Sequence, residues 1–305
     1  MQIINTLEGI RLSDTAITVG KFDGIHNGHQ LIFDRLRKKK KQGLKTVVFT
    51  FTKAPRQMQT DETVQYIFTE AEKYHYYELM DVDILVEYEM SKEFLSMSPR
   101  TFVKEVLVDT LGMKYICAGT DFRFGRERQG DARMLKELGS EYGFAVDIIE
   151  KKKYHAEDIS STRIRQLIKD GQMEDAHMSM GHPYCIIGTI VHGKQLGRQV
   201  GMPTINLIPP KDKLLPPNGV YAARIYLGGK EYHGITNVGC KPTVSSDKEM
   251  TVETYILNFN QDVYGQKAMV ELLCFIRPEK KFPSLEAVKE QVDKDIKICK
   301  KLCLE

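Results

Sequence analysis

Two kinds of hydrophobic pattern divide this chain of 305 residues. As far as about residue 170, short runs rich in β-branched residues alternate with amphipathic helical stretches. Strands are expected at 16–19, 45–51, 84–86, 115–118 and 146–149, and helices at 30–42, after the capping box Thr69–Glu72, after Ser98-Pro99 and after Asp131. Such alternation predicts a parallel sheet with helices on both faces, and ligands in that architecture bind beyond the carboxyl ends of the strands.

The pattern changes after Gly181-His182-Pro183. Strand-like runs follow at 185–191, 220–227, 231–238, 252–257 and 267–276, joined by Gly, Pro and Asn turns, with no helical pattern until 284–302. Closely spaced strands of this kind predict an antiparallel barrel or sandwich with a terminal helix as a cap. We therefore expect a boundary near Pro183, with domains at 1–182 and 183–305.

The composition argues against several classes of protein. A net charge of +3 is too small to indicate nucleic-acid binding, and the basic run Arg37–Lys41 stands at the end of an expected helix, where cations face the negative end of the helix dipole. The six cysteines form no CxxC pair, so neither a disulfide framework nor a zinc site is indicated. No apolar stretch approaches the roughly 18 residues of a membrane span, and the first residues lack the pattern of a secretory signal. We expect a cytoplasmic protein without a membrane or nucleic-acid partner.

The richest local signal is the segment Gly20–His29, GKFDGIHNGH, which follows the first expected strand and leads into a helix. Two histidines three residues apart project from one helix face, and the glycines allow a phosphate to approach backbone N–H groups. The alternative is that one histidine caps the helix while the other packs on the sheet. Packing alone does not explain so many glycines, because glycine loses backbone entropy wherever it has no conformational task. This segment therefore predicts a polyphosphate site.

Two further segments suit a nucleotide. Hydroxyls and arginines in Ile159–Arg165, ISSTRIR, open a helix and match phosphate oxygens, although an N-cap with solvated arginines is the plainer interpretation. The strand-end loop Gly119–Gly125, GTDFRFG, offers a carboxylate and two aromatic rings to a nucleotide or flavin.

The second half has its own glycine-rich segment at 188–206, with Gly188, Gly193, Gly197 and Gly201. This spacing indicates backbone wrapped closely around a ligand, but a bulge or a tight barrel corner is more common. Neither the P-loop pattern nor the protein-kinase motifs occur in the chain, so kinase chemistry here would belong to another structural class.

These segments resemble the motifs of one family, in family order. GKFDGIHNGH, AGTDFRFGRERQGD and ISSTRIR are similar to the HxGH, DFRFG and SSTxxR motifs of bacterial bifunctional riboflavin kinase/FAD synthetases. Pro203–Asn206 resembles the PTAN motif of riboflavin kinases, and similar matches are found at Pro217–Tyr221, Asn237–Gly239, Glu253–Leu257, Asp262–Gly265 and Phe275–Phe282. The resemblance implies a Rossmann-like nucleotidyltransferase sheet followed by a Greek-key type antiparallel β-barrel.

For the first half, the resemblance implies adenylylation of FMN by ATP, with Mg²⁺, to give FAD and pyrophosphate. It assigns His26 and His29 to catalysis and to ATP. The other residues implied for this ATP site are Gly20, Phe22, Asp23, Asp121, Ser161, Thr162 and Arg165. Ala54 stands where the family usually has a histidine, and Lys21 where it has a small polar residue.

For the second half, it implies phosphorylation of riboflavin by ATP to give FMN. Thr204 and Asn206 would hold Mg²⁺, Glu253 would be the general base, and Arg277 and Phe282 would contact the flavin. The ATP site would comprise Gly188, Gly193, Gly201 and Thr204. Ile205 and Asn258 depart from the family pattern without touching these roles. Small molecules are the only partners implied.

Two competing hypotheses deserve comparison. HxGH alone fits a monofunctional adenylyl- or cytidylyltransferase with a regulatory barrel, but Thr204, Asn206 and Glu253 argue for a second active site. A nucleic-acid-binding barrel fused to an enzyme would need an aromatic and basic stripe along its strands, which the sequence lacks.

Overall fold

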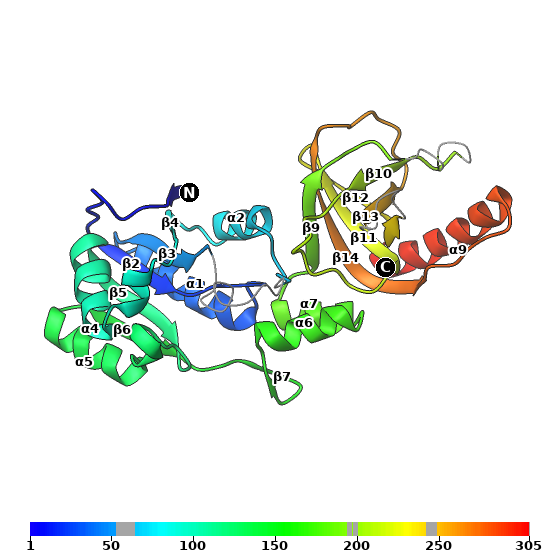
Figure 1. Cartoon of the computed structure of the whole chain (residues 1–305). Helices are drawn as coiled ribbons and strands as arrows, with labels where there is room; N and C mark the ends of the chain where they lie inside the picture. Colours follow the sequence, from blue (N-terminus) through cyan, green and yellow to red (C-terminus); the bar gives the residue numbers. More distant parts are fainter. Residues whose placement is uncertain (53–64, 194–196, 198–200, 242–248, 305) are drawn as a thin grey trace. The chain divides into compact units, whose positions relative to one another are not determined.

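The computed structural model describes residues 1–52, 65–193, 197, 201–241 and 249–304, and forms two compact units (Figure 1). Unit 1 comprises Met1–Val64 and Lys73–Ile159. Unit 2 comprises Gln65–Glu72 and Ser160–Glu305.

The sheet of unit 1 is parallel in all its pairings and has the order β1-β4-β3-β2-β5-β6. Its strands are β1 (Gln2–Ile4), β2 (Thr15–Val19), β3 (Lys45–Phe51), β4 (Ile84–Tyr88), β5 (Met113–Gly119) and β6 (Ala145–Ile149). Strands β3 and β4 follow β2 in the chain and lie on one side of it in the sheet, whereas the next strand, β5, lies on the other side of β2. The carboxyl ends of β2 and β5 therefore form a switch point, the place where ligands bind in sheets of this type.

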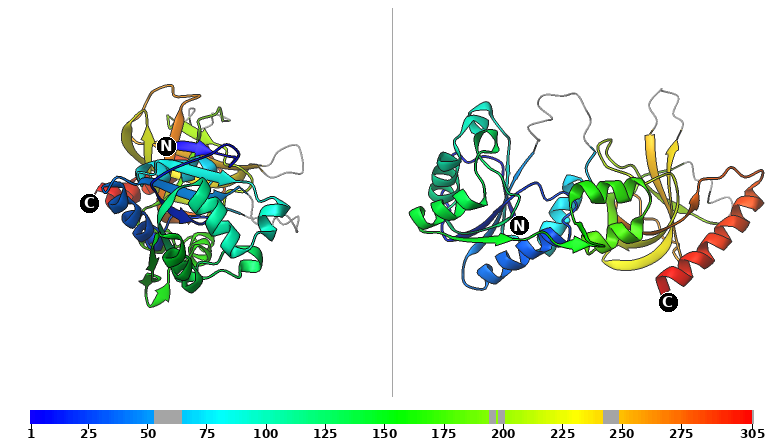
Figure 2. Two further views of the ribbon diagram at one scale, coloured as in Figure 1. Left: turned by 90° about the vertical axis from the view of Figure 1, so that its left-hand side faces the viewer. Right: turned by 90° about the horizontal axis from the view of Figure 1, so that it is seen from below.

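Helices cover both faces of this sheet, as the alternating pattern predicts (Figure 2). Helix α1 (Asn27–Lys40) buries Ile32, Phe33 and Leu36. A helix wound as a π-helix (Phe102–Thr110) and α5 (Ala132–Tyr142) pack into the main apolar cluster with alternate residues of the strands. The remaining helices of this half are α2 (Glu70–Leu79), α3 (Lys92–Ser96) and α4 (Pro99–Thr101).

The helix starts predicted at Asp131 and Ser98 are confirmed, and two details of the helices differ from expectation. Asp131 caps α5, since its carboxylate accepts a hydrogen bond from the backbone N–H of Met134 at 2.8 Å. Ser98 likewise caps the helix at Pro99, but that helix changes to π-winding after one turn. Helix α1 begins earlier than expected, at Asn27, because His26 serves as its N-cap.

The sheet of unit 2 is antiparallel, with the order β10-β13-β12-β11-β14-β9. Its strands are β9 (Tyr184–Thr189), β10 (Thr204–Leu207), β11 (Gly219–Leu227), β12 (Lys230–Lys241), β13 (Glu249–Ile256) and β14 (Lys267–Pro278). Because β14 returns to lie beside β11, the order β14-β11-β12-β13 is a Greek key. A bridge between Val191 and Asn206 joins the chain after β9 to β10, so the sheet curls toward closure as a barrel.

Helix α9 (Leu285–Leu304) packs against β11 and β12 through its C-terminal half (Figure 2). Cys299 lies in a small apolar cluster with Val220, Ala222 and Ile235. The terminal helix therefore caps one face of the barrel, as predicted. Unit 2 also contains α6 (Ser161–Lys169), α7 (Met173–Met180) and a short segment of the first half, 65–72. A two-stranded sheet, β7 (Lys153–Tyr154) with β8 (Glu157–Asp158), precedes α6.

The compact units do not divide the chain at Pro183. Segment 65–72 belongs to unit 2 because Tyr66 forms a bridge with Lys213, and the Lys213 ammonium makes a buried ion pair with Glu72 at 2.7 Å. Helix α7 also contacts β14 and β9. The assignment of functions to 1–182 and 183–305 stays a prediction.

Candidate functional site

The turn after β2 is backbone-strained. Phe22 and Ile25 have positive φ angles of 47° and 34° without being glycine, and Gly24 between them has φ 85°. For a β-branched residue such as Ile25 this conformation is a genuine outlier, and such residues cost about 1–3 kcal/mol each. Gly20 is required because a Cβ there would lie 2.9 Å from the Phe22 ring. Strain held at the switch point is typical of a ligand-binding turn.

His26 and His29 face one another at the start of α1. The Nδ1 atom of His26 accepts a hydrogen bond from the backbone N–H of His29 at 3.3 Å. The two rings stack, with centroids 3.6 Å apart and planes inclined by 16°. Gly28 permits this approach, since a Cβ there would meet the His26 ring at 3.2 Å. Phe22 packs edge-on against His29 with centroids 5.0 Å apart.

Burial and the neighbouring His26 lower the pKa of His29 well below its ordinary value. His29 is therefore neutral near pH 7, and its buried Nδ1 has no hydrogen-bond partner among the described residues. A neutral imidazole beside the N–H groups of a helix N-terminus can donate hydrogen bonds to an anion. Asp23 is also buried in this turn.

Asp121 follows β5, which neighbours β2 at the switch point. Its carboxylate lies 3.2 Å from the Lys151 ammonium and is largely exposed. Beyond it, the rings of Phe122 and Phe124 stack with centroids 5.3 Å apart. The loop therefore presents the Asp121 carboxylate, but the expectation that both rings face a ligand is wrong for Phe124, which is buried in the main apolar cluster with Phe122 packed against it.

Ser161, Thr162 and Arg165 lie in the first turns of α6, which Ser160 caps through the N–H of Arg163 at 3.3 Å. They belong to unit 2, whereas His26 and His29 belong to unit 1. Their common ATP site therefore stays a prediction.

In unit 2, strand register brings the predicted kinase residues together. Asn206 on β10 is the Cα partner of Glu253 on β13, and Thr204 lies two residues before Asn206. Since side chains two residues apart in a strand point to the same face, Thr204, Asn206 and Glu253 share one face of the sheet. Ile205 points to the opposite face and is buried.

Three of the four glycines in the segment 188–206 have a clear structural task, and one of them is Gly197, whose Cβ would lie 2.2 Å from the carbonyl oxygen of Met202. A Cβ on Gly193 would lie 2.6 Å from the amide nitrogen of Asn206, so only glycine leaves room for that side chain. Gly201 has φ 74°. By contrast, a Cβ on Gly188 would make ordinary contacts with Leu207 at 3.6 Å, so the fold itself does not demand glycine there.

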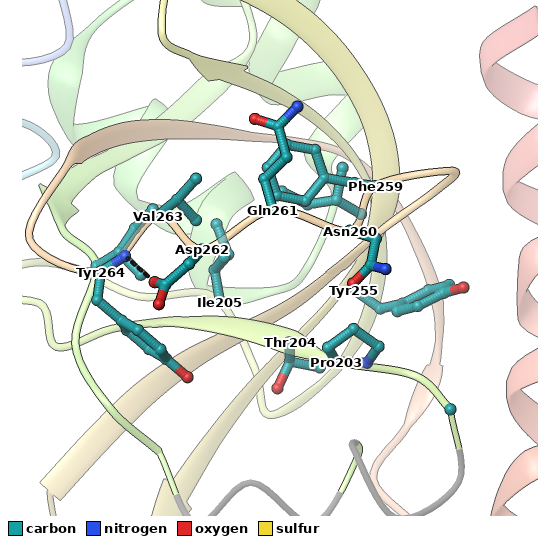
Figure 3. Close-up of a pocket in the computed structure, with 13 residues that line it drawn as sticks. Pro203, Thr204, Ile205, Tyr255, Phe259, Asn260, Gln261, Asp262, Val263 and Tyr264 are labelled. Carbon is teal, nitrogen blue, oxygen red and sulfur yellow. Dashed lines mark hydrogen bonds between the residues drawn. The ribbon is translucent and has the colours of Figure 1, made fainter.

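A cavity of 720 Å³ opens beside Thr204 (Figure 3). Its lining combines the rings of Tyr255, Phe259 and Tyr264 with the carboxylate of Asp262, which accepts a hydrogen bond from the N–H of Tyr264 at 3.2 Å. Tyr264 also stacks on His192, with centroids 3.6 Å apart. The lining also includes the polar side chains of Thr204, Asn260 and Gln261, so aromatic rings and hydrogen-bonding groups meet in one cavity, which suits a planar ligand that carries polar atoms. The sequence motif at Asp262–Gly265 could be recognised, but its role in a cavity could not.

Known proteins match the chain in the same two parts. The family model described as FAD synthetase matches residues 10–163, and the one described as riboflavin kinase matches residues 180–303. A "Bifunctional riboflavin kinase/FMN adenylyltransferase" of Buchnera aphidicola is 36% identical over 99% of this chain and 98% of its own length. A protein of the same name from Haemophilus influenzae is 33% identical over 98% of both chains. The chain belongs to the family of bifunctional riboflavin kinase/FMN adenylyltransferases.

The fold of this family member also matches a solved structure. A crystal structure titled as a macrolide-efflux protein from Streptococcus pneumoniae superimposes with a TM-score of 0.87 at 31% identity, covering 98% of each chain. In the part of this chain that the structure describes, no helix is long and apolar enough to cross a membrane.

Of the two residues predicted to contact flavin, Arg277 lies at the end of β14 and Phe282 lies between β14 and α9. Arg277 binds the buried carboxylate of Asp295 on α9 through its Nε and an Nη, the latter at 2.8 Å. The Arg277 guanidinium lies 5.7 Å from the centre of the Phe282 ring. The contact between Arg277 and Asp295 therefore holds α9 to the end of β14, independently of any contact that Arg277 makes with a flavin. Ala54, the departure from the family pattern, lies outside the described residues.

Proposed function

We propose that this protein makes FAD in two ATP-dependent steps, with riboflavin phosphorylated in unit 2 and FMN adenylylated at the switch point of unit 1. The observation that carries the kinase assignment is the register that pairs Asn206 with Glu253 on the face that also bears Thr204. The strained turn and the stacked histidines carry the adenylyltransferase assignment.

In the first reaction, Glu253 would take the proton of the ribityl 5′-hydroxyl as its oxygen attacks the γ-phosphorus of ATP, and ADP would leave. The half-buried position of Glu253, opposite an asparagine, holds the carboxylate on the face that the substrate must approach. The cavity beside Thr204 would hold the nucleotide base among its aromatic rings.

Mg²⁺ fits the residues present. Thr204 and Asn206 offer a hydroxyl and an amide oxygen on one face of β10, and Mg²⁺ prefers oxygen ligands, few of them from protein where substrate phosphates complete its coordination. When bound, the ion would neutralise charge on the transferring phosphoryl group. Gly193 keeps Asn206 in place by leaving room for its amide.

In the second reaction, a phosphate oxygen of FMN would attack the α-phosphorus of ATP, and pyrophosphate would leave. His26, His29 and the N–H groups at the start of α1 would bind the phosphate oxygens and stabilise the charge that develops on them. Asp121, Ser161, Thr162 and Arg165 would complete the ATP site. The neutral imidazole of His29 suits this task, because it can donate a hydrogen bond without itself taking part in proton transfer.

We also propose that the protein works in the cytoplasm with small molecules as its only ligands. Cys117, Cys185, Cys240, Cys274 and Cys299 form no disulfide bond, which suits a reducing compartment.

The test is to incubate the purified protein with riboflavin, ATP and Mg²⁺ and to separate the flavins by chromatography over time. We expect FMN first and FAD later. Glu253→Gln should abolish FMN formation while FMN supplied directly is still converted to FAD. The double variant His26→Ala/His29→Ala should show the reverse. Unchanged FMN formation by Glu253→Gln would exclude the proposed base, and FAD formation by the double variant would exclude the histidines.

A further inference from the structure

Three residues from three motif segments, none of which has a role above, meet at one carboxylate. Asn218 lies just before β11, Asn237 lies on β12, and Glu279 lies just after β14. The Asn237 amide donates to Glu279 Oε1 at 2.9 Å, and the Asn218 amide donates to Oε2 at 3.4 Å. Each oxygen of the Glu279 carboxylate thus accepts a hydrogen bond from a different segment.

The backbone is adapted to this contact. A Cβ on Gly239 would lie 2.2 Å from Glu279 Oε1, so a larger residue here would push the end of the Glu279 side chain away from the Asn237 amide. Gly239 stands two residues beyond Asn237 on the same face of β12, so the glycine and the amide form one seat for the carboxylate. Glycine at position 239 thus leaves room for the carboxylate at the place where it accepts the hydrogen bond from Asn237.

This seat adjoins the proposed kinase site. Asn237 is the Cα partner of Glu253 in the pairing of β12 with β13, and Glu253 is the partner of Asn206 in the pairing of β13 with β10. Asn206, Glu253 and Asn237 therefore form a row across three neighbouring strands on one face. Side chains directly opposite each other in such pairs have Cβ atoms about 4.5–5.5 Å apart.

Glu279 also fixes the start of the connection from β14 to α9. On one side Arg277 holds this connection to Asp295 of α9, and on the other side Glu279 holds it to β12 and to the residue before β11. The same connection carries Phe282, whose ring packs near Arg277.

We propose that Glu279 is a positioning residue of the riboflavin kinase site, which orients Asn237 beside Glu253 and sets the β14–α9 connection as one wall of the flavin-binding face. The proposal rests on the proposed function of unit 2. Glu279 acts through the two asparagines, so its loss should weaken riboflavin binding without removing the general base. We expect Glu279→Ala to raise the KM for riboflavin about tenfold while kcat changes little, because a hydrogen bond to a charged group is lost from the binding face.

Exchanging the hydrogen-bond donor and acceptor between positions 218 and 279 distinguishes a positioning role of Glu279 from a general contribution to stability. In Glu279→Gln, the new amide keeps an oxygen for Asn237 but turns an N–H toward the amide of Asn218. Adding Asn218→Asp supplies an acceptor for that N–H and keeps the net charge of the pair unchanged. We expect Glu279→Gln to raise the KM for riboflavin, and Asn218→Asp/Glu279→Gln to return it toward the wild-type value. Lys281→Ala, at an exposed position of the same connection, is the matched control.

The measurements are riboflavin turnover, FMN adenylylation, and riboflavin affinity by titration of flavin fluorescence, which needs no turnover. Adenylylation should be unaffected in every variant. An unchanged riboflavin KM and affinity in Glu279→Ala would overturn the proposal, and so would a loss that the swap leaves unrestored. If the wild-type protein binds riboflavin but never phosphorylates it, the proposed kinase function fails, and the affinities of the variants still decide the role of Glu279.

Discussion

The buried ion pair between Lys213 and Glu72 offers the sharpest test of how unit 2 is held together. Both side chains are 0% exposed. The Lys213 ammonium donates to the carbonyl of Ile67 at 2.7 Å, to the carbonyl of Cys185 at 2.8 Å and to Glu72 Oε2 at 2.7 Å. All three N–H donors of the ammonium are therefore satisfied.

Glu72 is bound just as fully, and this limits the damage when its partner is removed. Its Oε1 accepts from the N–H of Ile187 at 3.0 Å and its Oε2 from the N–H of Thr69 at 2.6 Å. In Lys213→Met these two bonds remain, but the carboxylate stays buried without a counter-charge, and the carbonyls of Ile67 and Cys185 lose their donor. Removing one partner of a buried pair costs about 3–5 kcal/mol of unfolding free energy. We expect a loss of about 3 kcal/mol, at the lower end because the backbone bonds persist.

The assay is denaturant unfolding of the full chain followed by circular dichroism. Riboflavin with ADP should shift the transition of unit 2 to higher denaturant, because a ligand that binds only the folded state stabilises it, and this shift identifies the transition to follow. Glu72→Gln/Lys213→Met should recover much of the loss, since neither charge then remains buried. Lys169→Met, at an exposed position at the end of α6, should change the stability by less than about 0.5 kcal/mol. A loss below about 1 kcal/mol in Lys213→Met would refute the reasoning, and so would a double variant less stable than the single one.

Two further predictions concern the two sites separately. Gly193→Ala should lower riboflavin phosphorylation at least about tenfold, because its Cβ would meet the amide of Asn206 at 2.6 Å. FMN adenylylation should stay unchanged. Equal turnover of riboflavin by Gly193→Ala and wild type would contradict the tight packing. Because the pKa of His29 is lowered in the folded protein, the folded state binds fewer protons than the unfolded state below about pH 6.5. The free energy of unfolding should therefore fall as the pH drops through this range, by at most about 1.4 kcal/mol per pH unit. His29→Gln should flatten that part of a stability–pH curve, and an unaltered slope would count against a buried, neutral His29.

Much of the fold could be read from the sequence, because local signals decide it. Alternation of strands and helices predicts the parallel sheet, and the cap at Asp131 predicts where α5 begins. Strand β10 was not predicted, since it has only four residues after Pro203 and too little alternation to show. The π-winding of Phe102–Thr110 was also missed, because nothing in the sequence separates it from an ordinary amphipathic helix.

The burial of Lys213 could not be anticipated for a different reason. A lysine between charged residues in Lys211-Asp212-Lys213 is usually solvated, and its partner Glu72 lies 141 residues away along the chain. The capping box at Thr69–Glu72 was recognised, and the N–H of Thr69 does donate to the Glu72 carboxylate. The same carboxylate then serves a second, long-range purpose that no local pattern reveals.

The two proposed sites differ in what holds their residues in place, and this explains why one was easier to recognise. In unit 1, a continuous turn of ten residues, Gly20–His29, places the histidines, so the motif itself contains most of the geometry. In unit 2, Asn206, Glu253 and Asn237 come from three strands, and only their register puts them on one face. A slip of one residue between β13 and its neighbours would turn Glu253 toward the interior of the barrel and Thr254 outward. Thr254 opposes this slip, because its hydroxyl is hydrogen-bonded to that of Thr236 at 2.9 Å inside the barrel. The kinase chemistry therefore depends on buried residues that never touch a substrate, and substitutions there should affect riboflavin phosphorylation before they affect adenylylation.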